Sequence, residues 1–233
     1  MDSSIKPFPG NGNGTPGYAA SNGAPLHFHP ALRFGARVLS YIFHPLFLPV
    51  YILAFLIYGH SLFPGFESRD KALLLVRFFI MYSLFPLVTV LLTKAVGFID
   101  SVFLRTQRDR IIPYVACGVY YFWMWYVLKN QPELPRQLVL LALGIFLASS
   151  AGLILNAFLK ISMHALSLGV MVAFILILAF RTDASFGAYI SVALLIAGLV
   201  STARLISGDH TTGEVYLGLL VGAACQGIAA FFF

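Results

Sequence analysis

Ionisable residues gather in one short stretch near the C-terminal end of the chain. Arg204, Asp209, His210 and Glu214 lie within eleven residues, between two long apolar segments. Charged side chains at the edge of an apolar segment are costly, which makes them candidates for a functional site. Glu214 follows His210 by four residues, so both side chains share one face if a helix begins there. A carboxylate so placed can orient and activate a nucleophilic imidazole.

The position of His210 relative to the helix start also bears on anion binding. If the last helix begins near Thr211, His210 is its N-cap, where free backbone N–H groups and the helix dipole favour an anion. The alternative is a loop at the membrane surface whose charges are simply solvated. Both interpretations fit the residue types, and the first predicts a phosphate or carboxylate ligand.

A second polar group precedes the apolar run near residues 159–169. His164 opens this run, and Lys160 and Ser162 stand just before it. A histidine at a helix start, beside a hydroxyl and a cation, suits phosphate binding and proton transfer. The alternative is an interfacial histidine that hydrogen-bonds only to the backbone.

Three arginines form a third group within residues 104–114. Arg105, Arg108 and Arg110 crowd ahead of an apolar segment, and guanidinium groups bind phosphate oxygens in a bidentate manner. We prefer Arg110 as a ligand because an Ile-Ile-Pro helix start follows it directly. Basic loops beside a membrane also contact anionic lipid headgroups, and Asp109 could pair with one of the arginines.

The elements that carry these groups predict an all-α fold, a polytopic transmembrane helical bundle. The chain is 59% hydrophobic and 10% charged, whereas soluble domains carry about 25% charged residues. A spanning helix needs roughly 17–25 mostly apolar residues, and the chain supplies about six to seven such segments. The expected helices lie near residues 38–58, 72–93, 111–128, 136–157, 164–180, 186–203 and 212–232.

The N-terminal segment differs from the rest of the chain. Residues 1–32 are rich in Gly, Pro, Asn and Ser, a composition that buries too little surface to fold. We therefore expect a disordered tail at 1–32 and a single transmembrane domain at 33–233. No Cys, His or carboxylate group has metal-ligand spacing, so we expect no metal and no cofactor.

Alternating spans place the three polar groups on the same membrane face. The expected loops 94–110, 158–164 and 204–211 are separated by pairs of spans, so all three emerge together. That face carries nine Lys and Arg residues against six on the other, which favours a cytoplasmic orientation. Four of the nine are candidate ligands, and setting them aside leaves five against six, so the sidedness stays open.

The C-terminal group resembles a known signature. Arg204, five residues, His210, three residues and Glu214 are similar to the third signature of the type-2 phosphatidic acid phosphatase superfamily, in which Asp usually stands at the last position. The resemblance covers roughly residues 94–222. The order and the shared face of all three groups agree with that superfamily, and the start of the first span resembles that of its small bacterial members.

The other two groups match their signatures more loosely. The segment 160–164 resembles the second signature, Pro-Ser-Gly-His, but Ile161 stands for Pro and Met163 for Gly. The segment 104–114 resembles the first signature, a basic residue followed by Arg-Pro, although two isoleucines follow Arg110 before the proline. Losing the glycine removes a close backbone approach to phosphate.

The resemblance implies a mechanism that needs no metal. His210 would attack phosphorus and form a phosphohistidine while Glu214 holds its ring. His164 would protonate the leaving oxygen, and Arg110 and Arg204 would neutralise the phosphoryl oxygens. Further phosphate contacts would come from Arg105, Arg108, Lys160 and Ser162.

The function implied is that of a membrane-embedded lipid phosphatase. A polyprenyl diphosphate is the first expected substrate, and phosphatidic acid or phosphatidylglycerol phosphate the next. We expect the chain in a bacterial inner membrane with membrane lipids as partners. The Gly218-x3-Gly222 spacing permits either tight packing within the chain or a homo-oligomer.

Other functions were weighed against this one. A membrane protein that binds or transports a lipid phosphate without catalysis stays open, because Met163 and Glu214 depart from the signatures. An aspartate-rich prenyltransferase is disfavoured because no aspartate cluster is present. Nucleic-acid binding is disfavoured because the net charge of +6 is spread over loops, without a basic face.

Overall fold

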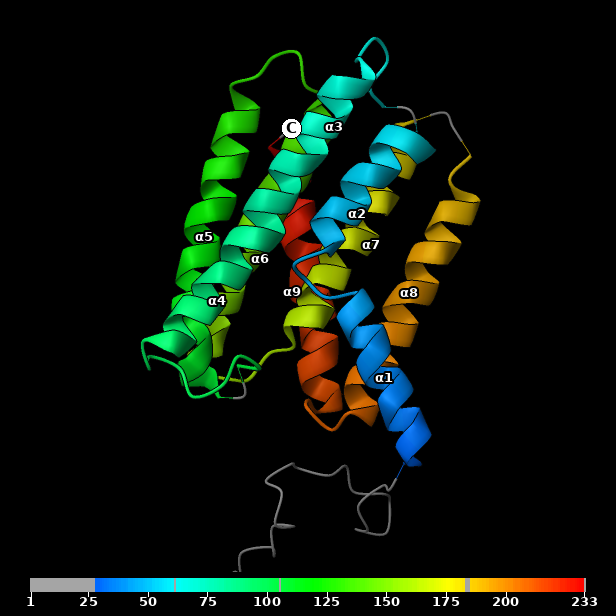
Figure 1. Cartoon of the computed structure of the whole chain (residues 1–233). Helices are drawn as coiled ribbons and strands as arrows, with labels where there is room; N and C mark the ends of the chain where they lie inside the picture. The colour runs from blue at the N-terminus through cyan, green and yellow to red at the C-terminus, as the bar shows by residue number, and fades with distance from the viewer. Residues whose placement is uncertain (1–27, 61, 105, 183–184, 233) are drawn as a thin grey trace, which may run out of the picture.

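The computed structural model describes residues 28–60, 62–104, 106–182 and 185–232 as a bundle of antiparallel and tilted helices (Figure 1). Within these ranges all regular structure is helical, and no strand is present. Six helical stretches are long and apolar enough to cross a membrane: Ser68–Ala95, α5 (Gln107–Lys129), α6 (Arg136–Asn156), α7 (Met163–Arg181), α8 (Gly187–Ile206) and α9 (Thr212–Phe231). The predicted transmembrane bundle is confirmed, and the chain is a multi-pass integral membrane protein.

The prediction of one continuous helix over 38–58 is wrong. This segment is divided into α1 (Pro30–Ile42) and α2 (Leu48–Ala54), which continues into a π-helical turn at Phe55–Gly59. Pro45 has no backbone N–H to donate, and its ring disfavours a helical conformation for the residue before it. The chain is therefore non-helical from residue 43 to residue 47.

The expected tail overlaps the start of the first helix. α1 begins at Pro30, where His29 accepts a hydrogen bond from the Ala31 amide through Nδ1 (3.3 Å). Residues 30–32 are thus helical rather than part of a tail. Residues 28 and 29 are non-helical, and residues 1–27 of the predicted tail lie outside the described residues.

The first full span also contains a local irregularity. It consists of α3 (Ser68–Phe79), a π-helical turn at Ile80–Leu84 and α4 (Phe85–Ala95). Pro86 lies in the first turn of α4, and its missing N–H leaves a carbonyl of the preceding turn without its usual partner. Ser83 lies in this turn and is 2% exposed. Its Oγ donates a hydrogen bond to the Leu46 carbonyl (2.7 Å), in the non-helical segment just before α2.

Glycines bring α7 and α9 into close contact. A Cβ atom on Gly169 would meet the Leu219 backbone, and one on Gly222 would meet the Leu166 carbonyl. The Gly218-x3-Gly222 spacing is therefore used for packing within the chain. This packing aligns the two helix starts, where the Ser162 amide donates to the Glu214 carbonyl (3.4 Å).

The connections that carry the polar groups share one end of the bundle. In Figure 1 the α4–α5, α6–α7 and α8–α9 connections lie at the lower end of the bundle, which is also the end at which α1 begins. This arrangement agrees with the alternation predicted from the sequence. Large apolar side chains such as Leu92, Trp123 and Leu220 are exposed on the outer helix faces, as lipid contact requires.

Candidate active site

His210 and Glu214 form a direct pair at the start of α9. His210 Nδ1 lies 2.9 Å from Glu214 Oε2. The His210 side chain is 3% exposed and that of Glu214 is 23% exposed. The imidazole is therefore enclosed, and its carboxylate partner reaches the edge of the site.

The helix start explains why this pair is held in place. Thr211, and not His210 as predicted, is the N-cap of α9. Thr211 Oγ1 accepts from the Glu214 amide (3.3 Å), and Glu214 Oε2 accepts from the Thr211 amide (3.2 Å). This reciprocal capping box was readable from the Thr-x-x-Glu spacing. It fixes Glu214 where it can also accept from His210.

Burial decides the charge of His210. Burial, followed by the positive charges of Arg204, Arg110 and Lys160, lowers the pKa of His210 to about 3, although a hydrogen bond with the Lys160 backbone favours the protonated ring. At neutral pH the 2.9 Å contact is thus a hydrogen bond from a neutral ring and not an ion pair. Because a carboxylate accepts, Nδ1 carries the hydrogen and Nε2 the lone pair.

Two cations from different segments flank His210. Arg204, in the last turn of α8, forms an ion pair with Asp209 (Nη2–Oδ2, 2.7 Å). Its Nε atom is buried and has no hydrogen-bond partner in the described part of the chain. Lys160 Nζ donates to the Asp209 carbonyl (3.3 Å), and burial lowers the pKa of Lys160. The α6–α7 and α8–α9 connections therefore meet beside His210.

Arg110 is the member of the arginine group that reaches the site. Its side chain is buried, donates from Nη1 to the Ile161 carbonyl (2.9 Å) and from Nε to the Leu104 carbonyl (3.0 Å). Its charge lowers the pKa of His210. Arg108 is exposed at the surface instead, and Arg105 lies outside the described residues.

Among the described residues, Asp109 hydrogen-bonds to no arginine. Its carboxylate Oδ1 accepts from the Asp100 amide (3.2 Å), and its own amide donates to Thr106 Oγ1 (3.1 Å), which caps α5. The described arginines therefore do not form the pair suggested by the sequence, and a pairing with Arg105 stays a prediction. Asp109 thus shapes the loop that leads into α5.

His164 lies in the first turn of α7 and faces α1. Its Nε2 is 3.1 Å from the Ser40 carbonyl oxygen. Ser162 is fully buried, and its Oγ accepts from the Ala165 amide (3.4 Å), so it serves as the N-cap of α7. The predicted phosphate contact from Ser162 stays a prediction.

Two further features lie beside these residues: His44, which from the sequence could either face the site or fill a gap in the helix, and a Gln107–Asn156 contact that the sequence did not predict. The His44 ring packs edge-to-face against His164, with centroids 5.2 Å apart; a His-Pro pair inside an apolar span was the only signal. Gln107 and Asn156 exchange side-chain-to-backbone hydrogen bonds of 2.8 Å in both directions. This exchange joins the start of α5 to the end of α6 and so holds Arg110 near the α6–α7 connection.

Comparisons of the chain with protein-family models, curated proteins and solved structures find no significant match. The resemblance to the phosphatase signatures therefore depends on the residues themselves. Within the described residues no group of three or more His, Cys, Asp or Glu side chains could hold a metal ion. The expectation of a metal-independent site stays a prediction.

Proposed function

We propose that this chain is a membrane-embedded lipid phosphatase that uses His210 as its nucleophile. The 2.9 Å contact between His210 Nδ1 and Glu214 Oε2 carries the proposal. It pairs a buried, neutral imidazole with a carboxylate that can stabilise the positive ring formed on attack. The positive charges of Arg204, Arg110 and Lys160 act on this ring, and such charges stabilise a transferring phosphoryl group.

In the first step, the His210 Nε2 lone pair attacks phosphorus and forms an N–P bond. The P–O bond to the lipid breaks, and its electron pair goes to the lipid oxygen, which takes a proton from the imidazolium form of His164 and leaves that ring neutral. Phosphoryl transfer depends chiefly on positioning and charge neutralisation. Arg204 is well placed for this role because its buried Nε has no partner among the described residues.

In the second step, water attacks the phosphohistidine while His164 accepts its proton. The N–P bond breaks, its electron pair returns to His210 Nε2, and inorganic phosphate leaves. For a diphosphate substrate the same steps cleave the terminal P–O–P bond. The chain's own histidines provide both the nucleophile and the acid–base group.

An apolar groove beside the site supports a lipid as the substrate. A groove of about 200 Å³ runs between α2, α7 and α8, with Phe43, Ile52, Ile175 and Ala193 among its walls. Phe43 precedes His44, which contacts His164, so one end of the groove lies close to the proposed acid. We propose a polyprenyl diphosphate first and phosphatidic acid or phosphatidylglycerol phosphate next, in a bacterial inner membrane, by analogy with the superfamily.

The test is release of inorganic phosphate by the detergent-purified protein from a panel of lipid phosphates and diphosphates. His210→Ala is compared with wild type, and His29→Ala serves as the control because His29 is exposed and its side chain accepts from the Ala31 amide at the start of α1, outside the proposed site and groove. We expect release by wild type and by His29→Ala and none by His210→Ala. Equal release by all three proteins would overturn the proposal.

Binding of a lipid phosphate without hydrolysis is the second candidate. It is favoured by the commitment of Arg110 to two backbone carbonyls and of Arg204 to Asp209, which leaves fewer donors for a transition state. In that case wild type releases no phosphate from any lipid. It still retains a lipid phosphate through purification, as measured by mass spectrometry of bound lipid, and Arg204→Gln loses it.

A further inference from the structure

The break between α1 and α2 frees a backbone carbonyl inside the bundle. In a continuous helix the Ser40 carbonyl would accept from the amide of residue 44, but α1 ends at Ile42. His164 Nε2 lies 3.1 Å from that Ser40 oxygen. Since a carbonyl only accepts, the contact requires a hydrogen on Nε2 of His164.

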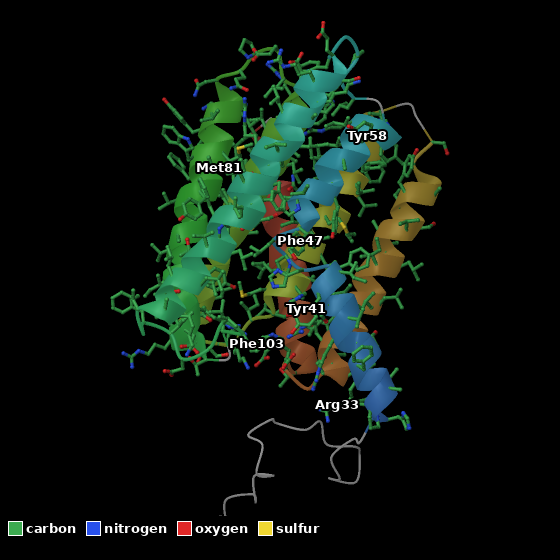
Figure 2. The ribbon with its side chains drawn as sticks, in the orientation of Figure 1. Arg33, Tyr41, Phe47, Tyr58, Met81 and Phe103 are labelled. Carbon is green, nitrogen blue, oxygen red and sulfur yellow. The ribbon has the colours of Figure 1, made fainter. Side chains whose placement is uncertain are left out.

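Side chains on both sides hold the break in its non-helical form. The Leu46 amide donates to His44 Nδ1 (3.3 Å), and Ser83 Oγ donates to the Leu46 carbonyl (2.7 Å). The Tyr51 hydroxyl donates to the Ile42 carbonyl (3.1 Å). Irregular backbone at membrane depth is tolerated where such groups satisfy it. Tyr41 and Phe47 flank the break in Figure 2, within the length of the bundle and away from its ends.

The same break presents the His44 ring to His164. The two rings meet edge-to-face, with centroids 5.2 Å apart and an interplanar angle of 83°, the geometry that aromatic rings prefer. His44 Nδ1 accepts from Leu46, so a neutral His44 carries its hydrogen on Nε2. His164 is thus held on one side by a carbonyl and on another by a ring.

We propose that the α1–α2 break is a positioning element for His164, with His44 as its positioning residue. It holds the neutral His164 ring in the Nε2–H tautomer, so Nδ1 is the atom that gives a proton to the leaving oxygen when the ring is protonated and takes one back from water. The part that concerns catalysis rests on the proposed function, in which His164 is the acid–base group. The part that concerns the tautomer does not.

The tautomer is tested directly by ¹⁵N NMR of histidine-labelled protein at alkaline pH, where imidazoles are neutral. The His164 signals are assigned by their loss in His164→Gln. We expect the Nε2–H tautomer in wild type and a mixture of both tautomers in His44→Ala. A wild-type His164 in the Nδ1–H form, or a spectrum unchanged by His44→Ala, overturns the inference whether or not the protein is a phosphatase.

Kinetics on a lipid phosphate test the catalytic part. His44→Ala should lower kcat roughly tenfold to a hundredfold with KM unchanged, as expected for a misplaced catalytic group. His44→Phe keeps the edge-to-face contact with His164 and should retain more of kcat than His44→Ala. If the alanine variant does not fold, the phenylalanine variant is compared with wild type instead. An unchanged kcat in His44→Ala overturns the positioning role. A wild type that is inactive on every lipid overturns the proposed function instead and leaves the tautomer result standing.

Discussion

The two histidines of the candidate site differ in how the chain builds their surroundings. His210 contacts a carboxylate four residues away, whereas His164 contacts a carbonyl 124 residues away. A carboxylate stabilises the imidazolium that forms when His210 attacks. The uncharged Ser40 carbonyl orients the His164 ring but stabilises its protonated form less than a carboxylate would. The difference agrees with the proposed roles, in which His210 of the local pair is the nucleophile and His164 exchanges protons.

The largest expected effect comes from removing the proposed nucleophile, His210. His210→Gln should lower kcat on a lipid phosphate by at least about 10⁴-fold, because removing a nucleophile abolishes the covalent route. No phosphohistidine should form when the variant is mixed with substrate and quenched in alkali. A phosphohistidine that still forms would move the nucleophile to another histidine, with His164 the first to test.

The second effect separates the acid from the nucleophile. His164→Gln should lower kcat on a lipid phosphate roughly 10²- to 10⁴-fold, the usual contribution of a general acid–base group. With p-nitrophenyl phosphate, whose leaving group needs no proton, the first step should stay fast while hydrolysis of the intermediate slows. Phosphohistidine should therefore accumulate in this variant, as measured by rapid quench. A variant that accumulates none would show that His164 also serves the attack step.

The same comparison shows which parts of the site a sequence can predict. The His210–Glu214 pair follows from helical spacing, and Thr211 follows from the capping-box spacing, because both depend on neighbours along the chain. The Ser40 and His44 contacts of His164 depend on where a broken helix packs. Pro45 inside an apolar span is compatible with a kink or with a full break, and only tertiary packing decides between them.

The arginine group shows the same limit. The sequence offers three arginines in one short loop, and helix geometry decides which of them turns inward. Arg110 follows the Thr106 N-cap by one turn and is buried against the α6–α7 connection, while Arg108 remains exposed. The six membrane spans from α3 onward, in contrast, were predictable to within a few residues, because hydropathy sets them. The segment 38–58 was not, because Pro45 divides it.

The third effect concerns pH and sharpens the role assigned to His210. Arg204 is among the charges that lower the pKa of His210, so Arg204→Gln should raise that pKa. The neutral nucleophile is then lost at a higher pH, and the acid limb of the kcat/KM profile should move upward. Arg204→Lys keeps the charge and should leave the limb near its wild-type position. An acid limb that is the same in Arg204→Gln would mean that another group controls it.

The smallest expected effect tests whether the capping box and the catalytic pair are separable. Glu214 Oε2 accepts from both the Thr211 amide and His210 Nδ1. Thr211→Ala removes only the hydroxyl that accepts from the Glu214 amide, so it should lower stability by about 1 kcal/mol. Because the Glu214 carboxylate keeps its hydrogen bond with His210, kcat should fall less than about tenfold.

Thermal unfolding and phosphate release are compared between Thr211→Ala and Thr212→Ala, which alters an exposed residue in the first turn of α9. We expect the control to match wild type in kcat. A loss of kcat in Thr211→Ala as large as that in His164→Gln would show that the cap itself positions the carboxylate. The local pair would then depend on its helix start as strongly as His164 depends on the broken helix.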